Sequence, residues 1–281
     1  AGLACAIKNC GIGNGVEEVS DTRLRVAAPD RIALYHGWTE MGQGMHTVAR
    51  QVLCEVLGLD ETVAIEIHCH TAAEAMGGMT TASRGTVLLG NSVIAAAEKL
   101  RADLDNRPLA ELVGREYEAR FRVDWTTAPD APGEVVSHFS YGFAVHMAVL
   151  DDQGGIDTLH AAHDAGRIIN PVLFEGQVEG GVVMGLGYAL QEHFPLEAGR
   201  LTSERLAALR LPRAKDVPTI KVVGVECPDR MGPFGAKGVG EIGTIPTAPA
   251  IANAYCRFDG QDRSILPLEP VKTELKKGKD R

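Results

Sequence analysis

The sequence has few basic clusters, no paired cysteine motif and no long apolar run. Its formal net charge is -9 and its one basic cluster is residues 276–279, so a phosphate backbone finds no matching surface and nucleic-acid binding is not expected. No apolar stretch approaches the roughly 20 residues that span a bilayer. No basic segment followed by an apolar one opens the sequence, as a secretory signal would. We therefore expect no membrane segment and a cytoplasmic location.

The six cysteines are scattered and form no Cys-x-x-Cys pair. This argues against a disulfide scaffold and against an iron–sulfur cluster on this chain. His68, Cys69 and His70 are the one local cluster of metal-ligating residue types. They end an alternating segment, and adjacent residues of a strand point to opposite faces. We expect a strand end there, with metal binding as the less favoured alternative.

Hydrophobic patterning indicates an α+β fold of mixed sheets packed with helices. The opening residues read as the interior of a strand, and alternating patterns predict strands at residues 23–28, 31–36, 64–69, 142–150 and 220–225. Helical spacing predicts helices at residues 45–57, about 87–104 and 174 to about 190, with a fourth that opens within 244–249. We take residues 1–281 as one unit, with a boundary between two lobes in the polar stretch around residues 105–132.

Three glycine-rich turns lie beside predicted helices, and the first places Gln43 between Gly42 and Gly44. Glycines let the backbone approach a flat ligand, and the amide has donors and an acceptor for its polar edge. A tight turn without a ligand explains the same pattern.

The second glycine-rich turn, residues 77–85, is a run of small and hydroxyl residues ahead of a helix. The helix start, the hydroxyls of Thr80, Thr81 and Ser83, and the Arg84 guanidinium together suit a phosphate. The Gly-Lys-Ser/Thr ending of a nucleotide-binding loop is missing. A Ser or Thr that caps the helix is the alternative.

The third turn, residues 232–243, has five glycines in twelve residues and one carboxylate, Glu241. Such a density is tolerated chiefly where a ligand comes close. A carboxylate at the rim of that ligand is a candidate general base, and a charge partner of a helix N-terminus is the alternative. Gln177 is the polar candidate in a further glycine-rich stretch, residues 176–187, where close helix packing is the alternative.

Taken together and in this order, these stretches resemble the second molybdopterin-binding half of the molybdenum hydroxylases, the family of xanthine dehydrogenase and aldehyde oxidase. The resemblance covers nearly the whole chain, and its segments are residues 39–47, 80–83, 164–171, 176–180 and 235–241. It implies the C-terminal lobe of that molybdopterin-binding domain, and a molybdenum ion held by the dithiolene of the pterin rather than by protein ligands. It also implies molybdopterin, alone or as its cytosine dinucleotide.

The resemblance also implies roles for single residues. Gln43 matches the residue that hydrogen-bonds the pterin, and Gln177 matches a further cofactor contact. Glu241 matches the family's catalytic glutamate, which takes a proton from a hydroxyl on molybdenum as that oxygen attacks a substrate carbon. The remaining implied cofactor-binding positions are Gly42, Gly44, Thr80, Thr81, Ala82, Ser83, Arg84, Lys237, Gly238 and Val239.

In this family the first molybdenum lobe, the [2Fe-2S] clusters and FAD lie on other domains or subunits, so we expect those partners and no turnover by this chain alone. The expected reaction is hydroxylation of an N-heterocycle, xanthine- or purine-like, or of an aldehyde, with water as the oxygen source. Residues 211–218 depart from the family pattern by being more basic. The alternative function is a remnant domain that binds only cofactor or partner subunits.

Overall fold

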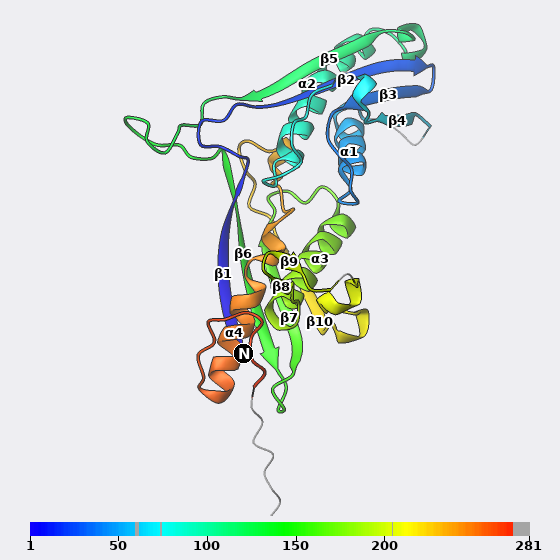
Figure 1. The fold of residues 1–281 in the computed structure, drawn as a ribbon. Coiled ribbons are helices and arrows are strands. Elements are labelled where there is room, and N and C mark those ends of the chain that lie inside the picture. The colour runs from blue at the N-terminus through cyan, green and yellow to red at the C-terminus, as the bar shows by residue number, and fades with distance from the viewer. Residues whose placement is uncertain (60–61, 74, 204, 272–281) are drawn as a thin grey trace, which may run out of the picture.

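The structure, a computed structural model, describes residues 1–59, 62–73, 75–203 and 205–271. Two four-stranded sheets lie crosswise to one another, each with two helices packed on it (Figure 1). The upper lobe of Figure 1 contains the strands β2 (Glu18–Ala28), β3 (Arg31–His36), β4 (Ala64–His68) and β5 (Glu116–Val123) and the helices α1 (Met45–Leu57) and α2 (Gly85–Leu104). The sheet order is β4-β3-β2-β5, and all pairs are antiparallel except β3 with β4.

The lower lobe contains the strands β1 (Gly2–Cys10), β6 (Ser140–Leu150), β7 (Ile156–Asp164) and β10 (Thr219–Val225) and the helices α3 (Pro171–Leu190) and α4 (Thr247–Asp259). Its sheet order is β1-β6-β7-β10, with only the β7 and β10 pair parallel. Helix α4 packs on β1 and β6, and α3 packs on α4 and β10. A small hairpin joins β8 (Leu196–Glu197) to β9 (Arg200–Leu201).

Short 3-10 helices occupy several connections. They are η1 (Thr71–Ala73), η2 (Leu109–Leu112), η3 (Leu206–Leu209), η4 (Ala214–Asp216), η5 (Pro233–Gly235) and η6 (Ile242–Thr244). The last two lie within the third glycine-rich turn, which returns from the lower sheet toward the upper lobe before α4 begins.

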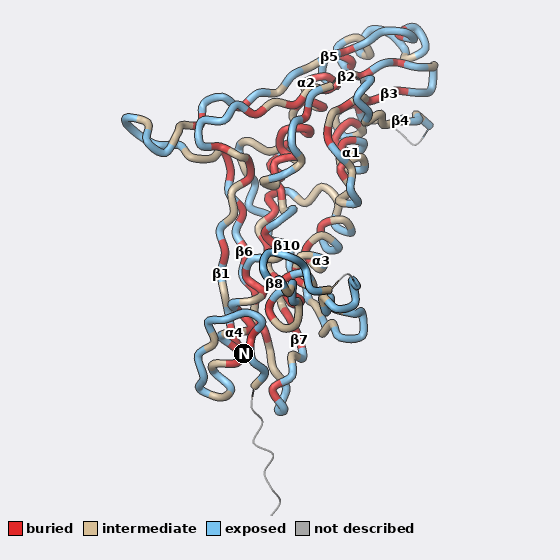
Figure 2. The backbone as a smooth tube through the Cα atoms, viewed as in Figure 1, coloured by how far each residue is buried: buried red, intermediate tan, exposed pale blue. Residues whose placement is uncertain are grey.

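Each lobe has its own hydrophobic core, visible as two regions of buried backbone in Figure 2. Helix α1 shows how the sequence builds this core. Its buried face is Met45, Ala49, Val52, Leu53 and Leu57, at spacings of three and four, and the left-handed Gly58 ends it. The predicted bounds of α1 are therefore confirmed.

Other predicted elements are confirmed with small shifts at their ends. Strand β3 has the predicted bounds, whereas α2 and α3 begin two and three residues before residues 87 and 174. Asn170 sets the start of α3, because its side chain accepts the Leu173 amide and Pro171 follows it. Four strands were not predicted: β5, β7 and the two short strands β8 and β9. Strand β5 lies inside the stretch expected to be a lobe boundary, and the chain crosses between the lobes after it, over residues 124–139.

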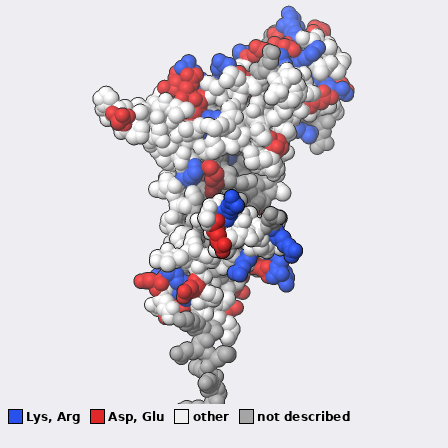
Figure 3. Space-filling view, in the orientation of Figure 1, with Lys and Arg blue, Asp and Glu red and all other residues white. Residues whose placement is uncertain are grey.

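On the face drawn in Figure 3, basic and acidic side chains lie next to one another at several places along the molecule, including its middle. Within the described part of the chain, no helix has the length and apolar character needed to cross a membrane.

Candidate active site

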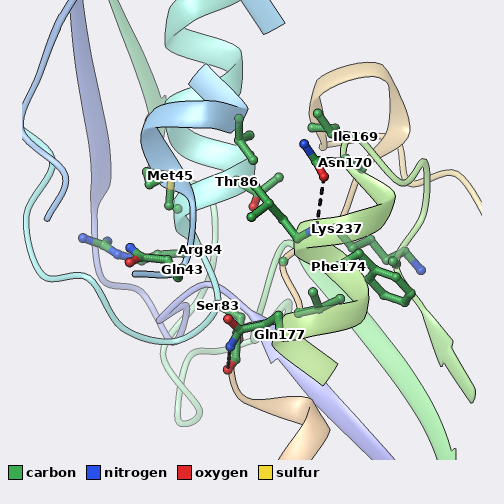
Figure 4. A pocket seen from close by; sticks show the side chains of 18 of the residues that line it. Gln43, Met45, Ser83, Arg84, Thr86, Ile169, Asn170, Phe174, Gln177 and Lys237 are labelled. Carbon is green, nitrogen blue, oxygen red and sulfur yellow. Dashed lines mark hydrogen bonds between the residues drawn. The ribbon is translucent and has the colours of Figure 1, made fainter. Parts of the chain in front are cut away.

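A cavity of about 290 Å³ lies at the junction of the two lobes. The first turns of α1, α2 and α3 converge on it, as does the stretch 236–241 of the third glycine-rich turn (Figure 4). Helix N-termini present unpaired backbone N–H groups and a partial positive charge, which favour anionic ligand groups. The lining residues include Gln43, Thr80, Thr81, Ser83, Arg84, Gln177, Lys237, Gly238, Val239, Gly240 and Glu241. The structure thus brings most of the predicted site residues together.

The loop before α2 has a strained backbone at the cavity. Ala82 and Ser83 are consecutive residues with left-handed φ angles of 55° and 48°. Conformations of this kind cost about 1–3 kcal/mol each and cluster at functional sites. The N-cap of α2 is Arg84 and no side chain caps the helix. The alternative of a Ser or Thr cap is therefore wrong.

Two site loops meet backbone to backbone across the cavity wall. A Cβ atom on Gly238 would lie 1.7 Å from the carbonyl oxygen of Ser83, so only glycine fits there. Cys10, buried behind the same glycine, donates its Sγ hydrogen to the Gly238 carbonyl at 3.3 Å. The glycines of the third turn therefore serve loop packing as well as any ligand.

The guanidinium of Arg84, which the sequence predicted to suit a phosphate, makes several hydrogen bonds within the fold. Its side chain is only 4% exposed, and its guanidinium donates to a Glu18 carboxylate oxygen at 2.9 Å and to the carbonyls of Gly77 and Met79. These bonds hold the loop before α2 to strand β2. Most of its donors are used within the fold, so the expected phosphate contact stays a prediction.

The two glutamines also have partners inside the chain. The Gln43 amide nitrogen donates to the Thr39 carbonyl at 2.8 Å and its oxygen accepts the Met41 N–H at 2.7 Å, which closes the first glycine-rich turn. Gln177 donates to the Gly240 carbonyl at 2.8 Å, and so ties α3 to the third turn. A primary amide has further donor and acceptor capacity, which remains for a ligand in both cases.

Glu40 organises the same turn, although the sequence did not single it out. One of its oxygens accepts from Gly42 and Gly44 and the other from His46. Burial acts to raise the pKa of this carboxyl, but the backbone N–H donors outweigh it and hold the pKa below its usual value. Glu40 thus accepts hydrogen bonds from backbone N–H groups at the N-terminus of α1.

Glu241 projects from the residue before η6 and its side chain is 46% exposed. Its Oε2 accepts the Ser83 hydroxyl at 3.0 Å and lies 3.1 Å from the ammonium of Lys8. It makes no cap to the following helical turn. The alternative role as a helix-end charge partner therefore has no hydrogen bond to support it.

Glu241 is the one carboxylate among the described residues that line the cavity, and no histidine or cysteine is among them. The three lining cations have carboxylate partners elsewhere: Arg84 has Glu18, Lys237 has Asp164 at 2.7 Å, and Arg167 has Glu55 at 3.1 Å. The cavity is otherwise largely apolar, with Met45, Val48, Ile168, Ile169, Leu173 and Phe174 in its wall. A proton acceptor from the described lining must therefore be Glu241.

Sequence reasoning missed the residues that support the site from a distance. Lys8 is the one charged residue of β1 and shares the strand face of Ala4 and Ala6, which is covered by α4 and η6. Because side chains alternate between the two faces of a strand, the position of Lys8 predicted a lysine on the covered face. That unusual placement could have identified it. No local pattern marked Glu18 or the apolar wall residues.

The local His and Cys cluster does not form a metal site. His68 stacks on Tyr35, and the Cys69 thiol donates to the Trp38 carbonyl. In the part of the chain that the structure describes, no three His, Cys, Asp or Glu residues are grouped to hold a metal ion. The expectation of a strand end is confirmed, because β4 ends at His68.

Comparisons with known proteins show the family of this chain. A family model described as a molybdopterin cofactor-binding domain matches residues 1–113 and 105–218. A probable xanthine dehydrogenase subunit of Bacillus subtilis is 31% identical, over 95% of this chain and 40% of the relative. The 6-hydroxypseudooxynicotine dehydrogenase complex subunit gamma of Paenarthrobacter nicotinovorans is also 31% identical, over 96% of this chain and 38% of the relative.

Solved structures share the fold. The aldehyde oxidoreductase of Desulfovibrio gigas superposes with a TM-score of 0.79 at 24% identity, over 93% of this chain and 30% of that one. Quinoline 2-oxidoreductase of Pseudomonas putida gives 0.74 at 21% identity, over 91% and 39%. The chain therefore belongs to the molybdopterin cofactor-binding domain family. It spans at most about 40% of the length of these curated relatives, and their names describe larger dehydrogenase components rather than this chain alone.

Proposed function

We propose that this chain is the second molybdopterin-binding half of a molybdenum hydroxylase and that Glu241 is its general base. One observation carries the proposal: the cavity on which three helix N-termini converge has a single carboxylate in its described lining and no other side chain there that can accept a proton near neutral pH. Family membership names molybdopterin with molybdenum as the cofactor.

The residues of the cavity fit that cofactor. The uncapped start of α2 and the hydroxyls of Thr80, Thr81 and Ser83 suit its phosphate, and the amides of Gln43 and Gln177 suit the polar edge of a pterin. The described lining contains no histidine or cysteine that would compete for the metal, which suits an ion held by ligands of the cofactor itself. Gly42, Gly44, Ala82, Arg84, Lys237, Gly238 and Val239 complete the proposed set.

When bound, the cofactor supplies the two-electron oxidation and the activated water oxygen. The protein residues have simpler tasks. The helix starts and amides orient the ligand, the apolar wall residues Ile169, Leu173 and Phe174 exclude water, and Glu241 accepts a proton at its carboxylate. Because Ser83 holds one carboxylate oxygen, the base has a defined direction before substrate arrives.

The finer assignments also rest on the resemblance. We propose an N-heterocycle, with a purine-like preference from residues 80–84, or an aldehyde as substrate. The names of the relatives support both classes, since they include xanthine dehydrogenase and aldehyde oxidoreductase. The curated relatives are longer than this chain, which supports a first molybdenum lobe, and their names describe them as subunits, which supports partner subunits. We propose that such partners carry the [2Fe-2S] clusters and FAD. The cytosine dinucleotide form and the cytoplasmic location stay predictions.

Metal and pterin analysis of the protein purified with its partner subunits tests the proposal. We expect about one molybdenum and one pterin per copy of this chain. Thr86 lies in the first turn of α2 and lines the cavity, so Thr86→Arg should abolish both. Thr219→Arg, on the exposed start of β10, is the matched control and should retain both. A wild-type protein without molybdenum would support a remnant domain instead.

A further inference from the structure

Lys8, near the start of the sequence, forms an ion pair with Glu241, near its end. Lys8 lies on β1, paired with Gly142 of β6, and its side chain is 18% exposed. Its Nζ lies 3.1 Å from Glu241 Oε2 and donates to the Asn9 carbonyl at 2.9 Å and to the Asn9 side-chain oxygen at 3.2 Å. An ammonium has three donors, so all three have an acceptor and the group is fixed in place.

Asn9 is itself held in position. Its amide nitrogen donates to the Gly11 carbonyl at 2.6 Å, so the loop that follows β1 fixes the oxygen to which Lys8 donates. The Lys8 ammonium is therefore held by the two Asn9 oxygens and pairs with the Glu241 carboxylate. A surface lysine without such a frame loses much side-chain entropy when it pairs, which is why exposed pairs contribute little.

Both contacts of the carboxylate fall on one oxygen. Ser83 and Lys8 each bind Oε2 of Glu241, whereas Oε1 has no hydrogen-bond or ion-pair partner among the described residues. Two anchors on one oxygen fix the carboxylate plane and leave the second oxygen for a ligand in the cavity. The other charged groups around the cavity do not compete for Glu241, because Arg84, Lys237 and Arg167 have carboxylates of their own.

We propose that Lys8 is a positioning residue, which orients Glu241 so that the free oxygen faces the reacting group. This rests on the proposed role of Glu241 as base. A misplacement of a reacting group by about 1 Å can lower a rate on the order of 100-fold. Lys8 itself does not touch substrate, so its loss should reduce kcat and leave KM nearly unchanged.

The test uses the assembled enzyme and four variants: Lys8→Met, Lys8→Arg, Glu241→Gln and the double variant Lys8→Met with Glu241→Gln. Lys221→Met is the matched control, because Lys221 lies exposed on β10 of the same sheet. We expect Lys8→Met to keep its molybdenum content and Tm and to lose kcat on the order of 10- to 100-fold. Lys8→Arg, which keeps charge and donors, should recover most of that loss, and Lys221→Met should change nothing.

The double variant separates positioning from a general structural role. If Lys8 acts through Glu241, adding Lys8→Met to Glu241→Gln lowers kcat no further. A crystal structure of Lys8→Met gives a readout apart from activity, in which the Glu241 carboxylate should leave its single orientation. A further loss of kcat in the double variant, an unmoved carboxylate, or normal kcat in Lys8→Met would overturn the proposal. Failure of the base assignment shows separately, as near-normal turnover in Glu241→Gln.

Discussion

Three buried histidines should make the stability of this protein fall steeply in mild acid. His146 and His163 share a 2.8 Å contact between their Nε2 atoms, and the Nδ1 of His146 bonds the Thr247 hydroxyl at 3.0 Å. His36 lies in the other lobe beside His46. Burial lowers the pKa of His36 and of His163 to about 4 each, and burial together with His163 lowers the pKa of His146 to about 3.

The sign and size follow from proton linkage. The ordinary pKa of a histidine is 6.5, so below that pH the unfolded chain binds protons that the folded chain does not. The free energy of unfolding therefore decreases as the pH decreases. The loss runs from about pH 6.5 down to about pH 4. A pH of about 5 lies about 1.5 units below the unfolded-state pKa of each histidine. This corresponds to a loss of about 2 kcal/mol in the free energy of unfolding per histidine. Three such groups give about 6 kcal/mol, a large part of a typical total of about 5–15 kcal/mol.

Urea unfolding at neutral pH and at about pH 5, followed by circular dichroism, measures this difference. His163→Gln removes one of the three titrating groups and also the neighbour that helps to lower the pKa of His146, so the difference between the two pH values should shrink by at least about 2 kcal/mol. His138→Gln is the control, because His138 is only partly buried and bonds Tyr141 rather than any of the three buried histidines, and it should leave the difference unchanged. A free energy of unfolding that is flat across this range in the wild-type chain would refute the reasoning.

Two further predictions concern the packing around the site, one for a glycine with its matched control and one for a buried ion pair. Gly238→Ala puts a Cβ 1.7 Å from the Ser83 carbonyl oxygen and should lower the molybdenum content. Gly240→Ala is the control, because its Cβ meets only the Ser83 hydroxyl at 3.6 Å, and it should keep the molybdenum content. Metal analysis of both proteins measures the difference. Glu18→Gln leaves the buried Arg84 without its counter-charge and should cost about 3–5 kcal/mol in the free energy of unfolding, measured by chemical denaturation. A loss below about 1 kcal/mol would mean that the pair is dispensable.

Helices with strong periodicity and clear end signals were predictable from the sequence. Helix α1 is the best case, because its apolar spacing and Gly58 fix both ends. Strand β7 was missed because buried polar residues, above all His163, interrupt its apolar pattern. Strand β5 does alternate, with Tyr117 and Val123 buried and charged residues such as Glu116 exposed, but it was missed because it lies within the polar stretch interpreted as a lobe boundary.

For the site, the sequence predicted the loops better than their contacts. Glycine density pointed to the third turn, and the cavity does contain Glu241. The ion pair of Arg84 was not predicted, because its partner Glu18 lies 66 residues earlier in the chain. Lys8 and Glu241 are farther apart still, and no local pattern can pair them. Such long-range pairs depend on how the two lobes pack, which spacing alone does not encode.

The most direct test of the central claim is Glu241→Gln in the assembled enzyme, with molybdenum content and turnover measured on the same sample. The amide keeps the size of the side chain but cannot act as a base. We expect full molybdenum content and a turnover lower by about 10²- to 10⁴-fold, while the exposed Glu175→Gln on α3 stays at the wild-type rate. Near-normal turnover in Glu241→Gln would contradict the assignment of this residue as the base.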